Sequence, residues 1–148
     1  ESQLDRFLLR ITLGYPDRAA ERELLTGGDR RAAALALRPV LGTEDLLAAQ
    51  QAVLAVRAAD ALLDYLQALI AATRSGAWFV EGLSPRAGIA VLRVARARAL
   101  MAGRDYVAPD DIQAILPQAI AHRLTPVPGA GRGAVEQVRA MVEAVPIP

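Results

Sequence analysis

The sequence predicts an all-α fold, a bundle of about five or six helices preceded by a short segment that contains one strand. Two observations lead to this prediction. Apolar residues recur at helical spacing in several separate windows after residue 43, and Gly or Pro residues interrupt the pattern between those windows. The chain therefore divides into residues 1–16, 17–42 and 43–148, and it contains no internal repeat.

The first region contains the expected strand, from Phe7 to Leu13, where apolar residues are concentrated. A single strand cannot satisfy its own backbone groups and needs neighbouring strands, which the rest of the sequence does not predict. The chain also begins at Glu1 without an initiator Met. We therefore expect this region to be the end of a larger unit whose remainder lies upstream.

The second region predicts a short helix and a connector. Asp17 can cap a helix that ends at Gly27 and Gly28. Residues 30–37 also favour a helix, but Pro39 interrupts it, so the structure of this stretch stays open.

The third region begins with two amphipathic helices. Thr43 offers a hydroxyl cap with acidic residues in the first turn, and a second helix follows from about Ala59 to Thr73. Their apolar faces comprise Leu46, Leu47, Val53 and Leu54 in the first helix and Leu62, Leu63, Leu66, Leu69 and Ile70 in the second.

The best-specified helix start in the sequence is Ser84 followed by Pro85. Serine is a preferred cap, and proline is favoured at the first helical position because no backbone donor is wasted there. This helix is expected to run to about Ala102 and to end at Gly103. Its predicted buried residues are Ile89, Leu92, Ala95, Ala99 and Leu100.

Two further helices complete the predicted bundle. One starts at Pro109, and Pro117 is expected to kink it or to start a second segment that ends near His122. Residues 125–133 are rich in proline and glycine and predict a loop. The last helix is expected from Ala134 to Ala144.

The composition excludes several kinds of chemistry. The 148 residues carry 17 basic residues, all of them arginine, and 16 acidic ones, so the near-neutral charge weakens a DNA-binding interpretation. The absence of cysteine removes disulfides and thiolate metal sites. A single histidine, His122, does not support a protein metal site or a hydrolase triad, and we assign it a structural role at a helix end.

Arginines become the candidate functional residues, because a guanidinium is permanently charged and its planar fork of donors matches phosphate oxygens. Arg86 lies in the first turn of the helix that Ser84 caps, where a cation opposes the helix dipole unless a bound phosphate compensates. Arg6 immediately precedes the expected strand, and strand ends line ligand clefts in α/β sheets. On local sequence alone, an exposed and solvated arginine remains the alternative for both.

Five short motifs, in the same order, resemble those of MoxR-family AAA+ ATPases. They are QLDRF at residues 3–7 with LGYPD at 13–17, GLSPRA at 82–87, GRDYV at 103–107, PDDI at 109–112 and HRL at 122–124. The resemblance covers essentially the whole chain. It implies that residues 1–16 are the C-terminal end of the AAA+ α/β core, 17–42 a linker helix and connector, and 43–148 the helical lid domain.

The resemblance also implies a role for each arginine. Arg6 matches the arginine finger, which reaches the γ-phosphate bound by a neighbouring subunit, and Arg86 matches the sensor-2 arginine, which reaches nucleotide from the lid. Both would neutralise charge that develops on the transferred phosphoryl group. Family members hydrolyse ATP at the subunit interfaces of a ring, usually a hexamer, and act as chaperone-like factors that assemble or activate other protein complexes.

The implied cofactors of the parent protein are ATP and Mg²⁺, but this chain alone is expected to bind neither and to be inactive. It has no lysine, so it cannot contain the phosphate-binding loop G-x-x-x-x-G-K-S/T, and it lacks the strand with acidic residues that would hold Mg²⁺. We expect a cytoplasmic protein with an unidentified client protein, no nucleic-acid partner and no membrane span.

A stand-alone helical protein-interaction module is the alternative interpretation. The two interpretations differ in what they predict for residues 6–13. An ATPase fragment would leave these residues disordered or packed on another chain, whereas a stand-alone module would integrate them fully into its own core.

Overall fold

The computed structural model describes residues 4–27 and 30–147, and these residues form seven α-helices and two short 3-10 helices. In chain order the elements are η1 (Leu4–Arg6), α1 (Arg18–Thr26), α2 (Arg30–Leu35), α3 (Thr43–Ala55), α4 (Asp60–Arg74), α5 (Pro85–Met101), α6 (Pro109–Ile120), η2 (Ala121–Arg123) and α7 (Ala134–Ala144). Gln3 of the first motif and Gly28, which we expected to end the first helix, lie outside the described residues.

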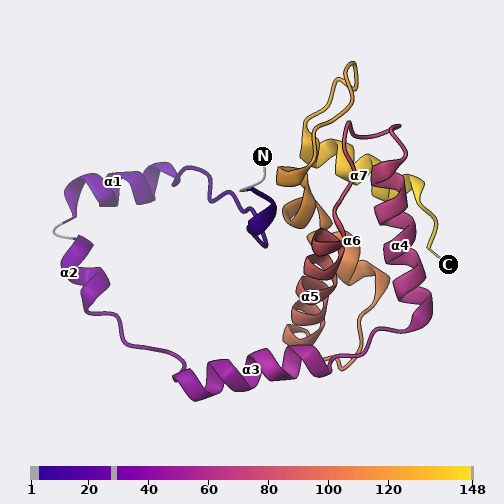
Figure 1. Ribbon diagram of the computed structural model, residues 1–148. Coiled ribbons are helices and arrows are strands. Elements are labelled where there is room, and N and C mark those ends of the chain that lie inside the picture. Colours follow the sequence, from indigo (N-terminus) through magenta and orange to yellow (C-terminus); the bar gives the residue numbers. More distant parts are fainter. Residues whose placement is uncertain (1–3, 28–29, 148) are drawn as a thin grey trace.

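Helices α4 to α7 form the body of the molecule, and α3 packs against one end of α5 (Figure 1). Helix α5 packs most extensively on α6, which in turn packs on α7. The core is largely aliphatic, as the composition predicts, and its fully buried side chains include Tyr65, Leu69, Phe79, Val91, Ile112, Leu116, Ile120, Val138 and Met141. The predicted helical bundle is confirmed.

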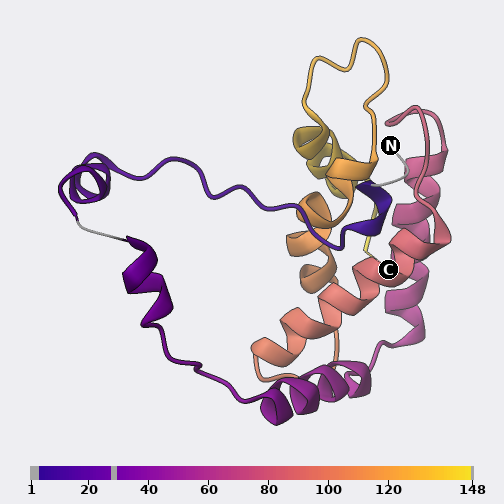
Figure 2. The same ribbon diagram turned by 60° about the vertical axis from the view of Figure 1, so that its left-hand side comes forward.

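Residues 11–27 and 30–42 form an arm that leaves the body and returns to it at α3 (Figures 1 and 2). Helix α1 in this arm has no buried residue. The large apolar side chains of the arm are exposed instead, with Leu25 at 82% and Leu37 at 79% of their accessible surface. The arm therefore contributes helices, and the residues of it whose burial is described add no side chain to the core.

The helix caps agree only in part with the predictions. Asp17 caps α1 as predicted, since its Oδ1 accepts a hydrogen bond of 2.8 Å from the Ala20 amide. The predicted hydroxyl cap of Thr43 is wrong, because Thr43 is itself the first helical residue and Gly42 occupies the cap position. The Asp45 carboxylate accepts from the Gly42 amide at 3.1 Å and so takes over part of the capping.

The start and end of α5 were predicted correctly, and its buried face was predicted in part: Ala95 and Ala99 are buried, and Leu92 and Leu100 pack against the core, but Ile89 does not. Ile89, expected in the core, is 72% exposed. A Cβ added to Gly88 would lie 2.7 Å from Cδ1 of Ile70, so α4 approaches α5 closely at a small residue. The neighbouring Ile89, about 100° further round the helix, is thereby turned away from α4. The residues that α5 buries are Ala87, Gly88, Val91, Val94, Ala95 and Ala99.

Helix α6 continues through Pro117 to Ile120 and is followed at once by η2. Of the two predicted outcomes at Pro117, the start of a second segment is wrong, since that segment begins only at Ala121, and the kink stays a prediction. Helix α6 and η2 follow one another without an intervening loop from Pro109 to Arg123, and together they are called the α6–η2 rod.

The strand expected from Phe7 to Leu13 does not form among the described residues. No neighbouring strand is present within them to exchange backbone hydrogen bonds, which a strand requires. The Arg10 amide donates instead to the Gln118 carbonyl of α6 at 2.9 Å. The apolar side chains stay largely outside the core, with Ile11 at 70% exposure, so neither full integration nor complete detachment describes this segment.

A buried carboxylate holds the link between α5 and α6 to the start of α6. Asp111 is 1% exposed and accepts hydrogen bonds of 2.7 and 2.6 Å from the two terminal nitrogens of Arg104 and one of 2.9 Å from the Ala108 amide. The hydrogen bonds from Arg104, with that from Ala108, hold the pKa of the Asp111 carboxyl below its usual range, against the opposing effect of burial.

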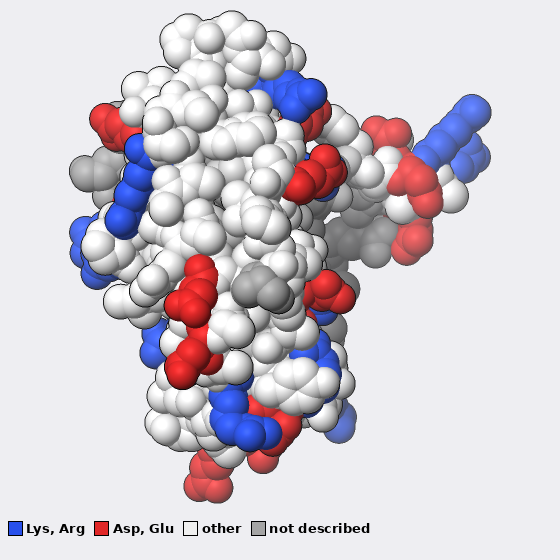
Figure 3. All heavy atoms as spheres, turned by 90° about the vertical axis from the view of Figure 1, so that its right-hand side faces the viewer, with Lys and Arg blue, Asp and Glu red and all other residues white. Residues whose placement is uncertain are grey.

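Figure 3 shows the side of the molecule on which α4 and α7 lie. Uncharged side chains cover most of this face, and acidic and basic side chains are interspersed rather than gathered by sign. Among the residues that the structure describes, no helix is both long enough and apolar enough to cross a membrane.

Candidate functional site

Arg86 occupies the second position of α5, and the predicted start of this helix is confirmed. Ser84 adopts an extended conformation, its Oγ accepts from the Ala87 amide at 3.2 Å, and Pro85 fills the first helical position. The Arg86 side chain is exposed and makes no hydrogen bond or ion pair with any described residue. Its guanidinium is therefore available to a ligand or to another chain.

The loop that delivers Arg86 is fastened to the end of α4. The guanidinium of Arg74 donates two hydrogen bonds, of 2.9 and 2.7 Å, to the Leu83 carbonyl. The Leu83 amide donates to Oγ1 of Thr73 at 3.1 Å, and Thr73 is fully buried. A Cβ on Gly82 would lie 2.8 Å from the Arg74 Cα, so the loop backbone can pass this close only with glycine at that position.

A second set of backbone bonds holds the same loop to the segment after η2. The Val80 amide donates to the Thr125 carbonyl at 2.9 Å, and the Val127 amide donates to the Trp78 carbonyl at 3.2 Å. Phe79, which lies between these bonds, is fully buried. The position of the α5 N-terminus is thus set by α4 on one side and by residues 125–127 on the other.

Arg6 ends η1 and is exposed, and it too has no hydrogen-bond or ion-pair partner among the described residues. Its two neighbours are held firmly. Asp5 forms an ion pair of 2.9 Å with Arg123, and the Phe7 carbonyl accepts a hydrogen bond of 2.6 Å from the same guanidinium. Arg123 therefore holds the side chain before Arg6 and the backbone carbonyl after it, and the Arg6 side chain has no such contact among the described residues.

The structure brings the two arginine-bearing segments to one place. A hollow of about 450 Å³ is bordered by Leu4 and Asp5 of η1, by residues 81–84 of the loop before α5 and by residues 122–125. Neither Arg6 nor Arg86 lines this hollow, but each follows a segment that does. Sequence reasoning did not predict that these segments lie close together within one chain.

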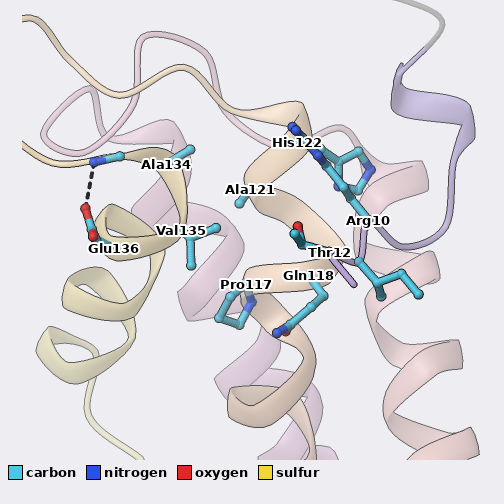
Figure 4. A pocket seen from close by; sticks show the side chains of 11 residues that line it. Arg10, Thr12, Pro117, Gln118, Ala121, His122, Ala134, Val135 and Glu136 are labelled. Atoms are coloured by element: carbon cyan, nitrogen blue, oxygen red, sulfur yellow. Dashed lines mark hydrogen bonds between the residues drawn. The ribbon is translucent and has the colours of Figure 1, made fainter. Parts of the chain in front are cut away.

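A second hollow, of about 660 Å³, lies between the N-terminal segment, the α6–η2 rod and the start of α7 (Figure 4). Arg10 and Thr12 border it on one side, and Val135 and Glu136 on the other. The Glu136 carboxylate accepts from the Gly133 amide at 2.9 Å, so it serves as a local cap for α7.

Two residues that hold the Arg86 and Arg6 segments, Arg74 and Arg123, were not predicted from the sequence. Arg74 lies at the end of a predicted helix, where a basic residue is unremarkable. Arg123 belongs to the HRL motif, which signalled its importance but not its contacts. Among the described residues, no group of three or more His, Asp or Glu side chains is arranged to hold a metal ion.

The helical bundle is similar to known domains in both sequence and structure. The family model described as "AAA lid domain" matches residues 71–144, which is 74 of 148 residues. A solved structure of a "putative ATPase" from Cytophaga hutchinsonii superposes with a TM-score of 0.81 and 27% sequence identity, covering 99% of this chain and 48% of that one.

The curated relatives point the same way. The chain is 38% identical to the uncharacterized protein YeaC of Bacillus subtilis, over 100% of this chain and 47% of the relative. It is 36% identical to the chaperone MoxR1 of Mycobacterium tuberculosis, over 84% of this chain and 35% of the relative. It is 42% identical to the protein MoxR of Methylorubrum extorquens, over 45% of this chain and 21% of the relative.

The chain belongs to the AAA lid domain family and is the lid portion of a MoxR-type AAA+ protein. It spans less than half the length of each of these relatives. The resemblance inferred from the five short motifs is thereby confirmed. The roles of Arg6 and Arg86 and the boundaries at residues 16 and 42 stay predictions.

Proposed function

We propose that this chain is the lid of an ATP-hydrolysing ring protein, in which Arg86 binds nucleotide from the lid and Arg6 acts on nucleotide held by a neighbouring subunit. The parent protein would supply the phosphate-binding loop and the acidic residues that hold Mg²⁺. The ring, which we expect to be a hexamer, would use ATP hydrolysis to assemble or activate a client protein complex.

The observation that carries this proposal is the placement of Arg86 on a family-typical lid. A cation in the first turn of a helix is unfavourable by about 0.3–1 kcal/mol, because it opposes the helix dipole. Arg86 has no acidic partner among the described residues to offset this cost. A phosphate at the same position would be stabilised by both the guanidinium and the helix N-terminus.

The rigid support of Arg86 favours the same function. An arginine stabilises a transition state at a lower entropic cost when the backbone that carries it is already held in place. The hydrogen bonds that Leu83 accepts from Arg74 and donates to Thr73 hold the backbone three residues before Arg86. The guanidinium itself remains free to bind a ligand.

Arg6 fits the complementary role in trans. Its side chain is exposed, and Arg123 holds its two neighbours through the Asp5 side chain and the Phe7 carbonyl. An exposed arginine on a fixed backbone can reach a nucleotide on an adjacent subunit without reordering its own chain. The hollow beside η1 and residues 81–84 places the two arginine-bearing segments side by side, so one lid could present both.

The test is steady-state ATP hydrolysis by the full-length protein that contains this chain. Arg6→Ala should lower kcat strongly, because an arginine finger contributes about 10³–10⁵-fold in GTPases. Arg86→Ala should lower kcat/KM by roughly 10- to 150-fold, the equivalent of one charged hydrogen bond of about 1.5–3 kcal/mol.

Arg132→Ala is the matched control, because Arg132 is an exposed arginine in the loop before α7. It should leave turnover, ring size and thermal stability unchanged. Wild-type turnover in both Arg6→Ala and Arg86→Ala would contradict the proposed function.

A further inference from the structure

The side chain of Arg123 makes an unusual set of contacts for the last residue of a 3-10 helix. Its side chain is only 4% exposed. One terminal nitrogen donates to the Asp5 carboxylate at 2.9 Å, and the other donates to the Phe7 carbonyl at 2.6 Å. These partners lie more than one hundred residues earlier in the chain and directly flank Arg6.

Because the Arg123 side chain is buried, losing these contacts would be costly. A guanidinium removed from water is costly unless its donors are paired, and removing one partner of such a pair leaves a charge without compensation. Two donors of Arg123 are paired in this way, one with the Asp5 carboxylate and one with the Phe7 carbonyl. A lysine could reach one of them as a point charge but could not span both, because it lacks the planar fork.

His122 adds a second donor to the same carbonyl. Its Nε2 lies 3.1 Å from the Phe7 oxygen, and since a carbonyl only accepts, the hydrogen must lie on Nε2. In that tautomer Nε2 cannot also accept from Nε of Arg123, which is 3.4 Å away, so the Phe7 contact is the one we assign. The Arg10 amide, bonded to the Gln118 carbonyl at 2.9 Å, continues the attachment along α6.

The contacts of Arg123 attach the Arg6 segment to the lid, and the core of the lid connects Arg123 to Arg86. Arg123 ends the rod formed by α6 and η2, and α6 packs along α5, whose first turn carries Arg86. Both helices bury their shared face, so they should move as one body. The path from Arg86 to Arg6 therefore consists of packed helices and one buried guanidinium.

We propose that Arg123 is a positioning residue that fastens the Arg6 segment to the lid, so that a lid movement driven by nucleotide carries the arginine finger with it. This inference rests on the proposed function for the role of Arg6, but the attachment itself does not. The attachment couples nucleotide bound at Arg86 of one subunit to the position of Arg6, which the same subunit presents to its neighbour.

The first experiment tests the attachment by hydrogen–deuterium exchange of the full-length protein, followed in peptides that cover residues 4–13. Arg123→Gln should increase the exchange rate of the two hydrogen-bonded amides of this segment, those of Phe7 and Arg10, at least tenfold, because the segment loses its fixed position. Asp5→Asn should act in the same direction, and Arg132→Gln, the matched control, should not. Unchanged exchange in Arg123→Gln would overturn the proposal.

The second experiment tests positioning by a double-mutant cycle in ATP hydrolysis. Arg123→Gln should lower kcat at least tenfold with little change in KM for ATP, because nucleotide binding in the same subunit is intact. In an Arg6→Ala background the same substitution should change kcat less than twofold. Arg123→Lys should restore part of the activity, since it can still pair with Asp5.

An equal loss in both backgrounds would also overturn the proposal, because Arg123 would then act independently of Arg6. Failure of the proposed function gives a different result. Wild-type turnover in Arg6→Ala would show that Arg6 is not an arginine finger. The exchange experiment would still report whether Arg123 attaches residues 4–13 to the lid.

Discussion

The body and the arm are both helical, but they differ in what holds them. Helix α4 of the body buries five residues, whereas α1 of the arm buries none. Both carry leucines, and α1 even has the side-chain cap that α4 lacks. Helix formation thus depends on local capping and propensity, while burial requires a second surface, which the arm does not meet within the described residues.

The position of the N-terminal segment sharpens this difference. Residues 5–10 form hydrogen bonds with Arg123, His122 and Gln118 of the body. The side chains of Phe7 and Ile11 are nevertheless 63% and 70% exposed. Hydrogen bonds hold the backbone there, and the side chains of Leu4, Leu8 and Leu9, at 48%, 44% and 39% exposure, are only partly covered. Burial of apolar surface, which supplies most of the stability of a fold, therefore contributes less here than in the core.

The largest expected contrast is between core and arm truncations. Ile112→Ala, in a side chain with 0% exposure, should lower the free energy of unfolding by about 2–5 kcal/mol through lost burial and a residual cavity. Leu37→Ala, at 79% exposure, should change it by less than about 0.5 kcal/mol. Urea unfolding followed by circular dichroism measures both. Equal losses would show that the arm is packed in solution.

The next effect concerns the buried carboxylate of the body. Asp111→Asn should cost about 1–3 kcal/mol at pH 7, because it removes charged hydrogen bonds from Arg104. The folded pKa of Asp111 is lowered, so its contribution is fully present above the unfolded value of about 3.9 and is lost as the pH falls through the folded pKa.

The stability difference between wild type and Asp111→Asn should therefore stay constant from pH 7 to about pH 5 and shrink below about pH 4. Thermal unfolding across this range checks the sign. A difference that grew in acid would contradict the assigned ion pair.

The smallest expected effect is confined to the arm. Asp17→Ala removes the cap of α1 and should cost that helix about 0.5–2 kcal/mol, enough to fray it, without changing the melting temperature of the body. Nuclear magnetic resonance shifts of residues 18–26 would report the loss of helix. A cooperative loss of both regions would show that arm and body fold as one unit.

Much of the helical pattern could be predicted from local chemistry. The starts at Asp17 and Ser84 and the stop at Gly103 follow from capping groups that act within one turn, and the structure has all three. The cap at Gly42 and the exposure of Ile89 could not be predicted the same way. The first depends on where the helical dihedrals begin, and the second on how closely α4 approaches Gly88.

The residues of the candidate site also differ in whether local sequence could predict them. Sequence patterns identified Arg6 and Arg86, because each sits in a short motif with a local reason to be noticed. They did not identify Arg74 or Arg123, whose partners lie 9 and more than one hundred residues away in the chain. Long-range hydrogen bonds to backbone carbonyls leave no local pattern in a single sequence.

The sequence by itself determined the all-α class, the helix boundaries that carry caps and the MoxR-type family, because these depend on residue identity and spacing. Only the tertiary structure decided which face of α5 is buried, that Phe7 to Leu13 forms no strand among the described residues, and that Arg123 holds the backbone around Arg6. The physical reason is that burial and pairing are properties of two surfaces in contact, and local spacing describes only one of them.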